Sequence, residues 1–491
     1  MNKKQLPLFI LFSFFFLFFS TYPFSKSFVK AQTNTVPGFS CYRNLTGIVQ
    51  RTNQLQSHYP NLVSLIDIGD SWEKTNLGGS FGHDIYALVI ENKAISEPKP
   101  NLFLISGLRA NAFAPVEINL RFAEYLLSNY SNDWDFDYLL DHFAIHFIFS
   151  ANPDGRAKAE SQANGSGNPE DITWSKNTNP GTCTDGDGGV LLNNNFSYQW
   201  SPYPDNPCDS TFPGNSAFSE NETQAIKTYL DAIVLDNPNS SLLINLESFD
   251  NFLISPYLYS KSHQVRNYDE YNILTNKLTY DSEAFPIPGD SNQFIAQRGT
   301  LVDYAHEELN MTALLYRIGP EMAGGFVSRC GYFEDYLFQQ TLQGLLNAAK
   351  SLPFPLEYPA GPEIINLQVD QSVFSNIVSF TGDLDSVSYY HSPRNTAIHA
   401  MHYSIDLPPW HPDAELIPID TFETFIDEPG KGLFTLELDK TTLLPGKHTV
   451  YIQAVAYDFE RNKIDAGFIS MTPIEVYIIT KNFFPIVCQD S

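Results

Sequence analysis

The strongest constraint on the fold is the alternation of short apolar runs with stretches of helical periodicity along the first 352 residues. Apolar runs of four to eight residues bounded by turn residues predict buried strands, and apolar residues spaced three and four apart predict amphipathic helices. The expected strands are 62–68, 84–91, 102–106, 144–149, 242–246 and 313–316, and the expected helices are 116–127, 220–234 and 332–352. Strands that alternate with helices predict an α/β domain with a mixed, largely parallel sheet flanked by helices.

The pattern changes abruptly after residue 352. Four prolines crowd into residues 353–362, which predicts a linker. Short alternating strands with turn signals follow, as in 449–456 after Pro445 and Gly446, and they predict an all-β, sandwich-like domain over 363–491. About 460 residues remain beyond the first segment of the chain, too many for one ordinary core, so we expect the α/β domain to cover 32–352 and the β domain to stand apart from it.

The first residues have the three-part pattern of a secretory signal peptide. A short basic start precedes an apolar run over 6–19, and small residues end at Ala31. The run is shorter than the roughly 20 residues that a membrane span needs, which favours cleavage over a retained signal anchor. We therefore expect a signal peptide over 1–31 and a protein that is secreted or resides in the lumen of the secretory pathway, without stable membrane insertion.

The net charge limits the expected partners, and the cysteine content indicates the compartment. The net charge is −27, and loss of a leader with four lysines and no acidic residue would make it −31. Such a surface repels nucleic acid and anionic lipid, so we expect neither as a partner, and the plain interpretation of the charge is solubility. An unidentified peptide or protein ligand is a separate hypothesis, which the charge neither supports nor excludes. Five cysteines predict disulfides with at least one thiol left over. N-glycosylation sequons, expected in a secreted glycoprotein, begin at Asn44, Asn129, Asn164, Asn195, Asn221, Asn239 and Asn310.

Ligands in open α/β sheets bind at the carboxyl ends of the strands. The segments there resemble the zinc carboxypeptidases of the carboxypeptidase A type, most closely secreted members with an extra C-terminal β domain. The resemblance runs from about 41 to 352 and is carried by the ordered motifs 68–73, 121–124, 151–156, 174–177, 193–196 and 218–223. It implies the carboxypeptidase fold and a disulfide between Cys183 and Cys208, which flank the same segment as a family disulfide.

The resemblance also implies a zinc site, and this chain departs from it. The family holds one zinc with two histidines and a glutamate, and the metal polarises the substrate carbonyl and activates water. Here Arg109 stands at the first histidine, Ala112 at the glutamate and Glu247 at the second histidine. Arginine offers no lone pair and alanine no donor, so Glu247 would be the lone ligand. We expect no zinc cofactor, unless the chain is an active enzyme after all.

The other family positions depart in the same way. Tyr316 aligns with the glutamate that acts as general base, and a tyrosine is a poor base at neutral pH. Ser175 aligns with the oxyanion arginine and Asn194 with the carboxylate-binding arginine, while Asn193 beside it is retained. The substrate-capping tyrosine falls near Ile295.

These departures predict a pseudopeptidase with no metal ligand and no catalytic residue, kept as a secreted binding or scaffold module. The alternative is an active zinc metallocarboxypeptidase that removes C-terminal residues from peptides. A third possibility is another hydrolytic chemistry in the same cleft, using Glu247 with Tyr316 or Asp250. No His-Glu-x-x-His or Gly-x-Ser-x-Gly motif occurs, and we expect structural roles for the histidines, including His142 and His146.

The substitutions make one structural prediction. Arg109 and Glu247 have opposite charge and replace two ligands of one metal. We therefore expect a direct ion pair, with the guanidinium where zinc would lie, because an unpaired buried carboxylate is costly. The alternative is that both side chains turn to solvent.

Overall fold

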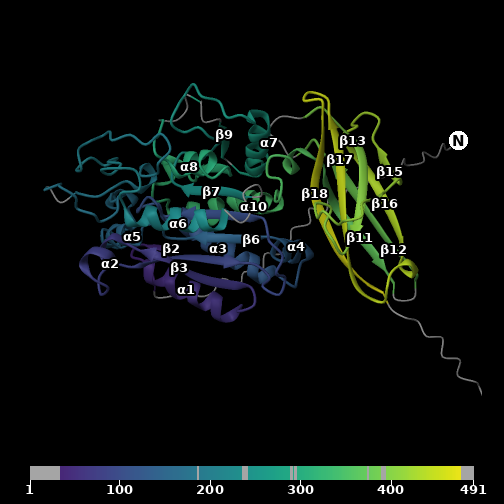
Figure 1. The fold of residues 1–491 in the computed structure, drawn as a ribbon, viewed down its shortest axis with the longest axis horizontal. Helices are drawn as coiled ribbons and strands as arrows, with labels where there is room; N and C mark the ends of the chain where they lie inside the picture. The colour runs from purple at the N-terminus through teal and green to yellow at the C-terminus, as the bar shows by residue number, and fades with distance from the viewer. Residues whose placement is uncertain are drawn as a thin grey trace, which may run out of the picture. The chain divides into compact units, whose positions relative to one another are not determined.

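The computed structural model describes residues 34–184, 187–234, 241–282, 284–287, 291, 296–372, 375–388 and 394–476. The expected signal peptide, Ile295, Asn239 and Cys488 lie outside this part of the chain. The described residues divide into an α/β part up to Lys350 and a β part from Glu363 (Figure 1).

An eight-stranded mixed sheet forms the centre of the α/β part, in the order β3-β4-β6-β5-β7-β10-β8-β9. The four central strands β6, β5, β7 and β10 run parallel, whereas β3 and β4 are antiparallel and β8 runs antiparallel to β10. The strand bounds are β3 Val63–Asp70, β4 Asp84–Ile90, β5 Asn101–Ser106, β6 Ala144–Ile148, β7 Ser241–Glu247, β8 Phe252–Ile254, β9 Phe285–Ile287 and β10 Thr312–Arg317. A two-stranded ribbon of β1 (Thr35–Val36) and β2 (Phe39–Arg43) precedes them.

Helices cover both faces of this sheet, which is why the central strands β5 and β7 are buried along their whole length. One core joins the sheet to α1, α3, α4, α7 and α10, and a second core joins the opposite face to α6 and α8. The helix bounds are α1 Leu45–His58, α2 Trp72–Leu77, α3 Phe113–Asn129, α4 Trp134–His142, α5 Pro153–Ser161, α6 Asn221–Val234, α7 Tyr268–Thr279, α8 Leu301–Glu307, α9 Cys330–Tyr332 and α10 Phe338–Lys350.

The β part consists of two antiparallel four-stranded sheets, β11-β12-β16-β15 and β14-β13-β17-β18. Apolar side chains of both sheets share one core, among them Phe380 and Leu436 from the first sheet and Ile452 and Met401 from the second. The strand bounds are β11 Glu363–Gln371, β12 Ile377–Asp385, β13 Thr396–Ile405, β14 Ile417–Pro418, β15 Phe422–Thr424, β16 Lys431–Asp439, β17 Gly446–Asp458 and β18 Lys463–Val476. The expected fold class, α/β followed by a β-sandwich, is therefore confirmed.

Helix α10 differs from the sequence prediction, and the structure adds to what the sequence indicated about the cysteines. The helix expected over 332–352 is interrupted by a π-helical turn over Phe333–Leu337. A disulfide joins Cys183 to Cys208, the pair that the resemblance implies. A second disulfide, which sequence reasoning left open, joins Cys41 in β2 to Cys330 in α9.

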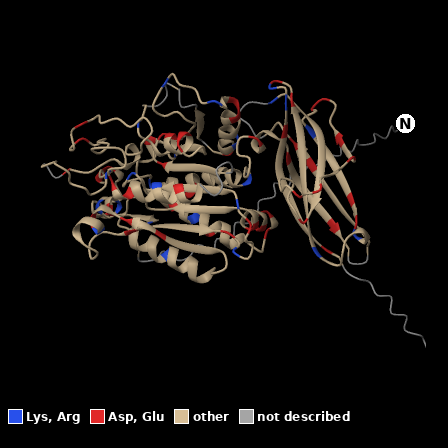
Figure 2. Ribbon diagram, in the orientation of Figure 1, with Lys and Arg blue, Asp and Glu red and all other residues tan. Residues whose placement is uncertain are grey.

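Acidic side chains occur on elements of both the α/β part and the β part (Figure 2). Among the described residues, no helix has the length and apolar character needed to cross a membrane.

Candidate functional site

The carboxyl ends of β5, β7 and β10 lie side by side at one edge of the central sheet. Ser106 at the end of β5 is in register with Leu246 in β7. Arg109 lies three residues after Ser106. Glu247 is in register with Arg317 of β10. Side chains in register on parallel neighbours point to the same face, so Glu247 and Arg317 lie next to each other at this edge.

Glu247 is a buried carboxylate, with 2% of its surface exposed. Burial raises the pKa of its carboxyl group, and the positive charges of Arg109 and Arg317 oppose that rise. Its Oε1 atom has no hydrogen-bond partner within the described chain. Arg109 and Arg317 therefore act on the Glu247 carboxyl group at longer range, and among the described residues neither forms an ion pair with it.

The predicted ion pair between Arg109 and Glu247 is wrong. Within the described residues, no nitrogen of Arg109 comes within 4.0 Å of a carboxylate oxygen of Glu247. The Arg109 guanidinium lies instead over the Phe326 ring, 4.5 Å from its centroid, and that ring packs edge-on against Phe249 at 4.7 Å. The negative face of an aromatic ring attracts a cation, which explains this choice of partner.

Nor does Arg109 turn fully to solvent, since the residue is partly buried and its Nε atom is fully covered. Burial lowers the pKa of the Arg109 guanidinium, the nearby Glu247 raises it, and Arg317 lowers it. The direct ion pair and the turn to solvent are therefore both wrong for Arg109. The sequence could not indicate its partner, because Phe326 lies in the loop before α9, far along the chain.

Arg317 forms the direct ion pair of the cleft, with Nη1 2.8 Å from Oδ2 of Asp250. The backbone holds the two residues together, because Ile318 N donates to Glu247 O at 2.7 Å and Asp250 N donates to Gly319 O at 2.9 Å. Burial raises the pKa of Asp250, and the charge of Arg317 opposes that rise.

Tyr316 lies on the opposite face of the sheet and is no part of this cleft. It is 3% exposed, belongs to the same core as its register partner Leu246, and its hydroxyl interacts with Ser282 and Thr341. Burial raises its pKa further above the ordinary value. The β10 side chain beside Glu247 is Arg317, so Tyr316 does not face the cleft in which a general base would have to lie. The alignment of Tyr316 with the family's glutamate stays a prediction.

The remaining family positions lie around the same edge. Ala112 is buried and precedes the first turn of α3, and the Ser175 carbonyl accepts from Ala110 N at 3.0 Å. Asn193 is buried, and its side-chain oxygen accepts a hydrogen bond from Asn245 Nδ2 at 3.1 Å. Asn245 lies on β7, two residues before Glu247.

Asn194 turns elsewhere, and its Nδ2 donates to the Thr211 carbonyl at 3.3 Å. Ser175 and Asn193 therefore border the cleft by these contacts, whereas no described contact brings Asn194 to it.

The residues present do not fit a zinc ion. At the three family ligand positions Glu247 is the one side chain with a lone pair for a metal. Across the part of the chain that is described, no three histidine, cysteine, aspartate or glutamate side chains gather as a metal site would need. Hydrolysis by Glu247 with Tyr316 is also disfavoured, because the two lie on opposite faces, and Asp250 is engaged by Arg317.

The histidines highlighted by the sequence have structural partners. His146 is buried in β6, with its ring nitrogens 2.6 Å from Tyr229 Oη and 3.0 Å from Asn101 Oδ1. His142 ends α4, and His306 lies in α8 beside Tyr271. Each is engaged in packing or hydrogen bonding.

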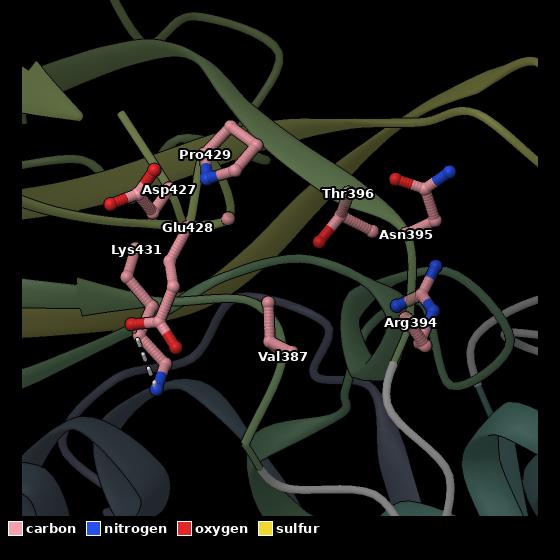
Figure 3. A pocket seen from close by; sticks show the side chains of 9 residues that line it. Val387, Arg394, Asn395, Thr396, Asp427, Glu428, Pro429 and Lys431 are labelled. Atoms are coloured by element: carbon pink, nitrogen blue, oxygen red, sulfur yellow. Dashed lines mark ion pairs between the residues drawn. The ribbon is translucent and has the colours of Figure 1, made fainter. Parts of the chain in front are cut away.

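A separate cavity of about 180 Å³ lies in the β part, between the start of β13 and the loop before β16 (Figure 3). Three of its charged side chains form ion pairs, since Lys431 pairs with Glu428 at 3.6 Å and Arg394 pairs with Asp458. We therefore place the candidate site at the sheet edge rather than in this cavity.

The fold defines a carboxypeptidase-like protein, and its cleft holds Arg109 and Arg317 near the buried Glu247. Residues 48–337 match the family model described as zinc carboxypeptidase. This is more than half of the chain, so the protein belongs to the zinc carboxypeptidase family.

Two kinds of relative match at similar identity. Carboxypeptidase A1 of Sus scrofa is 26% identical over 251 residues, covering 50% of this chain and 54% of the relative. Inactive metallocarboxypeptidase ECM14 of Paracoccidioides brasiliensis (strain Pb03) is 27% identical over 276 residues, covering 52% of this chain and 43% of the relative. The chain thus spans about half the length of the curated relatives it matches.

Solved structures agree on the fold. Thrombin activatable fibrinolysis inhibitor is 19% identical with a TM-score of 0.54, covering 63% of this chain and 74% of that one. Carboxypeptidase A from Helicoverpa armigera is 20% identical with a TM-score of 0.53, covering 62% of this chain and 73% of that one. At these identities the likeness concerns the fold alone.

Proposed function

We propose that this protein is a pseudopeptidase: a secreted member of the zinc carboxypeptidase family that has lost zinc binding and peptidase activity and serves as a binding or scaffold module. The observation that carries the proposal is the composition of the cleft, where Arg109 and Arg317 lie near the buried Glu247 and the buried Ala112 stands at an expected ligand position. The matched relatives named inactive metallocarboxypeptidases support it, because loss of activity has a precedent within the family.

The alternative, an active metallocarboxypeptidase, is supported by the match to carboxypeptidase A1. It would require metal ligands at positions where the chain has an arginine and an alanine. The ligand of the proposed module is a peptide or a protein. Asn194 replaces the family's carboxylate-binding arginine, so the cleft would no longer bind the C-terminal carboxylate of a peptide through paired hydrogen bonds.

The first prediction is that the purified protein binds no stoichiometric zinc and releases no C-terminal residues from mixed peptides, with or without added zinc. Zinc is measured by elemental analysis after dialysis, and released amino acids by chromatography. Carboxypeptidase A1, treated identically, serves as the control and should retain its zinc and its chelator-sensitive activity. One zinc per chain, or activity abolished by a chelator, would refute the proposal.

The proposed secretion leads to a second prediction, which concerns N-glycosylation. Asn164 and Asn310 are exposed, whereas Asn195 is fully buried and its Nδ2 donates to Pro213 O, Ser216 O and Ser219 Oγ. A glycan on Asn195 would have to break that network, and no buried space could hold the sugar. We expect glycans on Asn164 and Asn310 and none on Asn195.

The test is expression through a secretory host, followed by peptide mass spectrometry with and without enzymatic deglycosylation. Asn164→Gln and Asn310→Gln should each remove one glycan from the intact mass. Asn195→Gln should leave the glycan mass unchanged while lowering the yield of folded protein. A glycan found on Asn195 in folded, secreted protein would contradict the structural argument.

A further inference from the structure

The floor of the cleft contains hydrogen-bond acceptors that no described residue satisfies. Glu247 and Asn245 lie two residues apart on β7, so they point to the same face of the sheet, and they are 2% and 1% exposed. Oε1 of Glu247 and Oδ1 of Asn245 are covered and have no partner among the described residues. The amide nitrogen of Asn245 donates to Asn193 Oδ1 at 3.1 Å. Buried polar groups are normally satisfied, so these two oxygens indicate a place for a hydrogen-bond donor.

Hydrogen-bond donors without a partner belong to the same cleft. The Nε atoms of Arg109 and Arg317 are covered, and neither has a partner in the part of the chain that is described. Nη1 of Arg317 is paired with Asp250. The Arg109 side chain lies over the Phe326 ring, and no described residue forms a hydrogen bond or an ion pair with it. The positive charges of both arginines act on the carboxyl group of Glu247, so unsatisfied donors and acceptors lie close to one another.

The charges of these side chains decide which kind of ligand the cleft accepts. The guanidinium groups of Arg109 and Arg317 lie near two carboxyl groups, those of Glu247 and Asp250. A ligand carboxylate would be attracted by the first pair and repelled by the second, so little attraction would offset the loss of its hydration. Burying a charge without net attraction costs much more than burying a neutral amide that forms hydrogen bonds. The cleft therefore favours a neutral polar group.

A primary carboxamide matches this set of groups, because its nitrogen donates two hydrogen bonds and its carbonyl oxygen accepts. Its donor and acceptor stand side by side, so it can satisfy a carboxylate and a guanidinium that form no direct pair. We propose that the cleft binds peptides through a neutral primary carboxamide, at an amidated C-terminus or in an asparagine or glutamine side chain, and not through a free C-terminal carboxylate. This inference names a ligand class for the proposed binding module and rests on that proposed function.

The experiment offers three pools of N-acetylated tetrapeptides to the immobilised full chain. The first pool is amidated and lacks asparagine and glutamine, the second is its free-acid counterpart, and the third is a free-acid pool with glutamine at one position. Bound peptides are quantified by mass spectrometry. We expect the first pool to be bound at least about 10-fold more than the second. Enrichment of the third pool over the second would show that a side-chain carboxamide serves as well. Equal binding of all three pools, preference for the plain free-acid pool, or binding of no pool would overturn the inference.

Two glutamate variants separate the cleft from the overall negative charge of the chain. Glu247→Gln removes the repulsion of a ligand carboxylate, so the ratio of amidated to free-acid peptide should fall towards one. Glu423→Gln makes the same change of charge at an exposed position in β15 and should leave the ratio unchanged. Arg109→Gln should lower the binding of amidated peptides about 10-fold, because the carbonyl loses a charged donor. A ratio that is the same in Glu247→Gln and Glu423→Gln would overturn the inference.

The pools on the native chain give a decisive result even if a variant folds poorly. Release of C-terminal residues from the free-acid peptides, or one zinc per chain, would refute the proposed function itself. Preference for the free acid without cleavage and without zinc would refute the carboxamide inference alone, so the two failures are distinguishable.

Discussion

Replacing both Cys41 and Cys330 with alanine should lower the free energy of unfolding by about 5 kcal/mol. The disulfide joins residues 289 positions apart, so its loss frees a very long loop in the unfolded chain. The folded geometry should persist, because Tyr42 Oη still donates to Ser328 O at 2.7 Å and Arg121 Nη2 to Cys41 O at 3.2 Å. The loss therefore arises mainly in the unfolded state and is measured as a shift of the urea unfolding transition.

The second disulfide provides the matched control. Cys183 and Cys208 are 25 positions apart, so the corresponding double alanine variant should lose less, about 3.5 kcal/mol. Alanine is preferred to serine at these positions because Cys41 is buried, and a hydroxyl there would lack a partner. Equal losses in the two double variants would show that loop length does not govern the effect in this chain.

The fold was largely predictable from the sequence because its central strands are short apolar runs separated by clear helices. The expected strands over 102–106 and 144–149 correspond within one residue at each end to β5 and β6. The sequence analysis did not predict the helices α1, α4, α5, α7 and α8, nor the strands β1, β8 and β9, which are two or three residues long. Such short strands form by pairing with neighbours rather than by any periodicity of their own.

The candidate site was predictable in its place but not in its contacts. In β10 the residues 313–316 are all apolar or aromatic and buried, so they carry no alternation that tells one face from the other. That is why the sequence did not show that Tyr316 faces away from Glu247 and that Arg317 faces towards it. A shift of one residue in a strand moves every side chain to the opposite face.

The contact of Arg109 was unpredictable for a different reason. The sequence marked the residues that replace the metal ligands, but the loop that supplies Phe326 has no strand or helix pattern to place it. The opposite charges of Arg109 and Glu247 suggested an ion pair, whereas in the structure the guanidinium of Arg109 lies over the Phe326 ring. The positive charge of Arg109 still lowers the pKa of Glu247, so the two charges attract each other without a direct contact.

The last prediction concerns acid, and it follows from His146 in the core of the α/β part. Burial lowers the pKa of His146 to about 3, against 6.5 for an ordinary histidine. The ring stacks on Phe103 at 4.6 Å and is bonded at both nitrogens to Tyr229 and Asn101, so no room remains for water around a charged imidazolium.

The sign follows from proton linkage. Because the folded pKa lies below the unfolded value, the unfolded chain binds the extra proton, and stability is lost as the pH falls from 6.5 towards 3. Between pH 8 and pH 4 this one residue should lower the free energy of unfolding by about 3 kcal/mol. His146→Gln should remove that loss, although it lowers stability at pH 8 through poorer packing.

The measurement is urea unfolding at pH 8, 6, 5 and 4 for the native protein, His146→Gln and His58→Gln. His58 is exposed at the end of α1 and serves as the control for replacing a histidine without burial. The gap between native and His146→Gln should close as the pH falls, and His58→Gln should follow the native curve. A constant gap at every pH would mean that His146 takes up its proton in the folded state, and the buried, neutral imidazole inferred from its contacts would then be wrong.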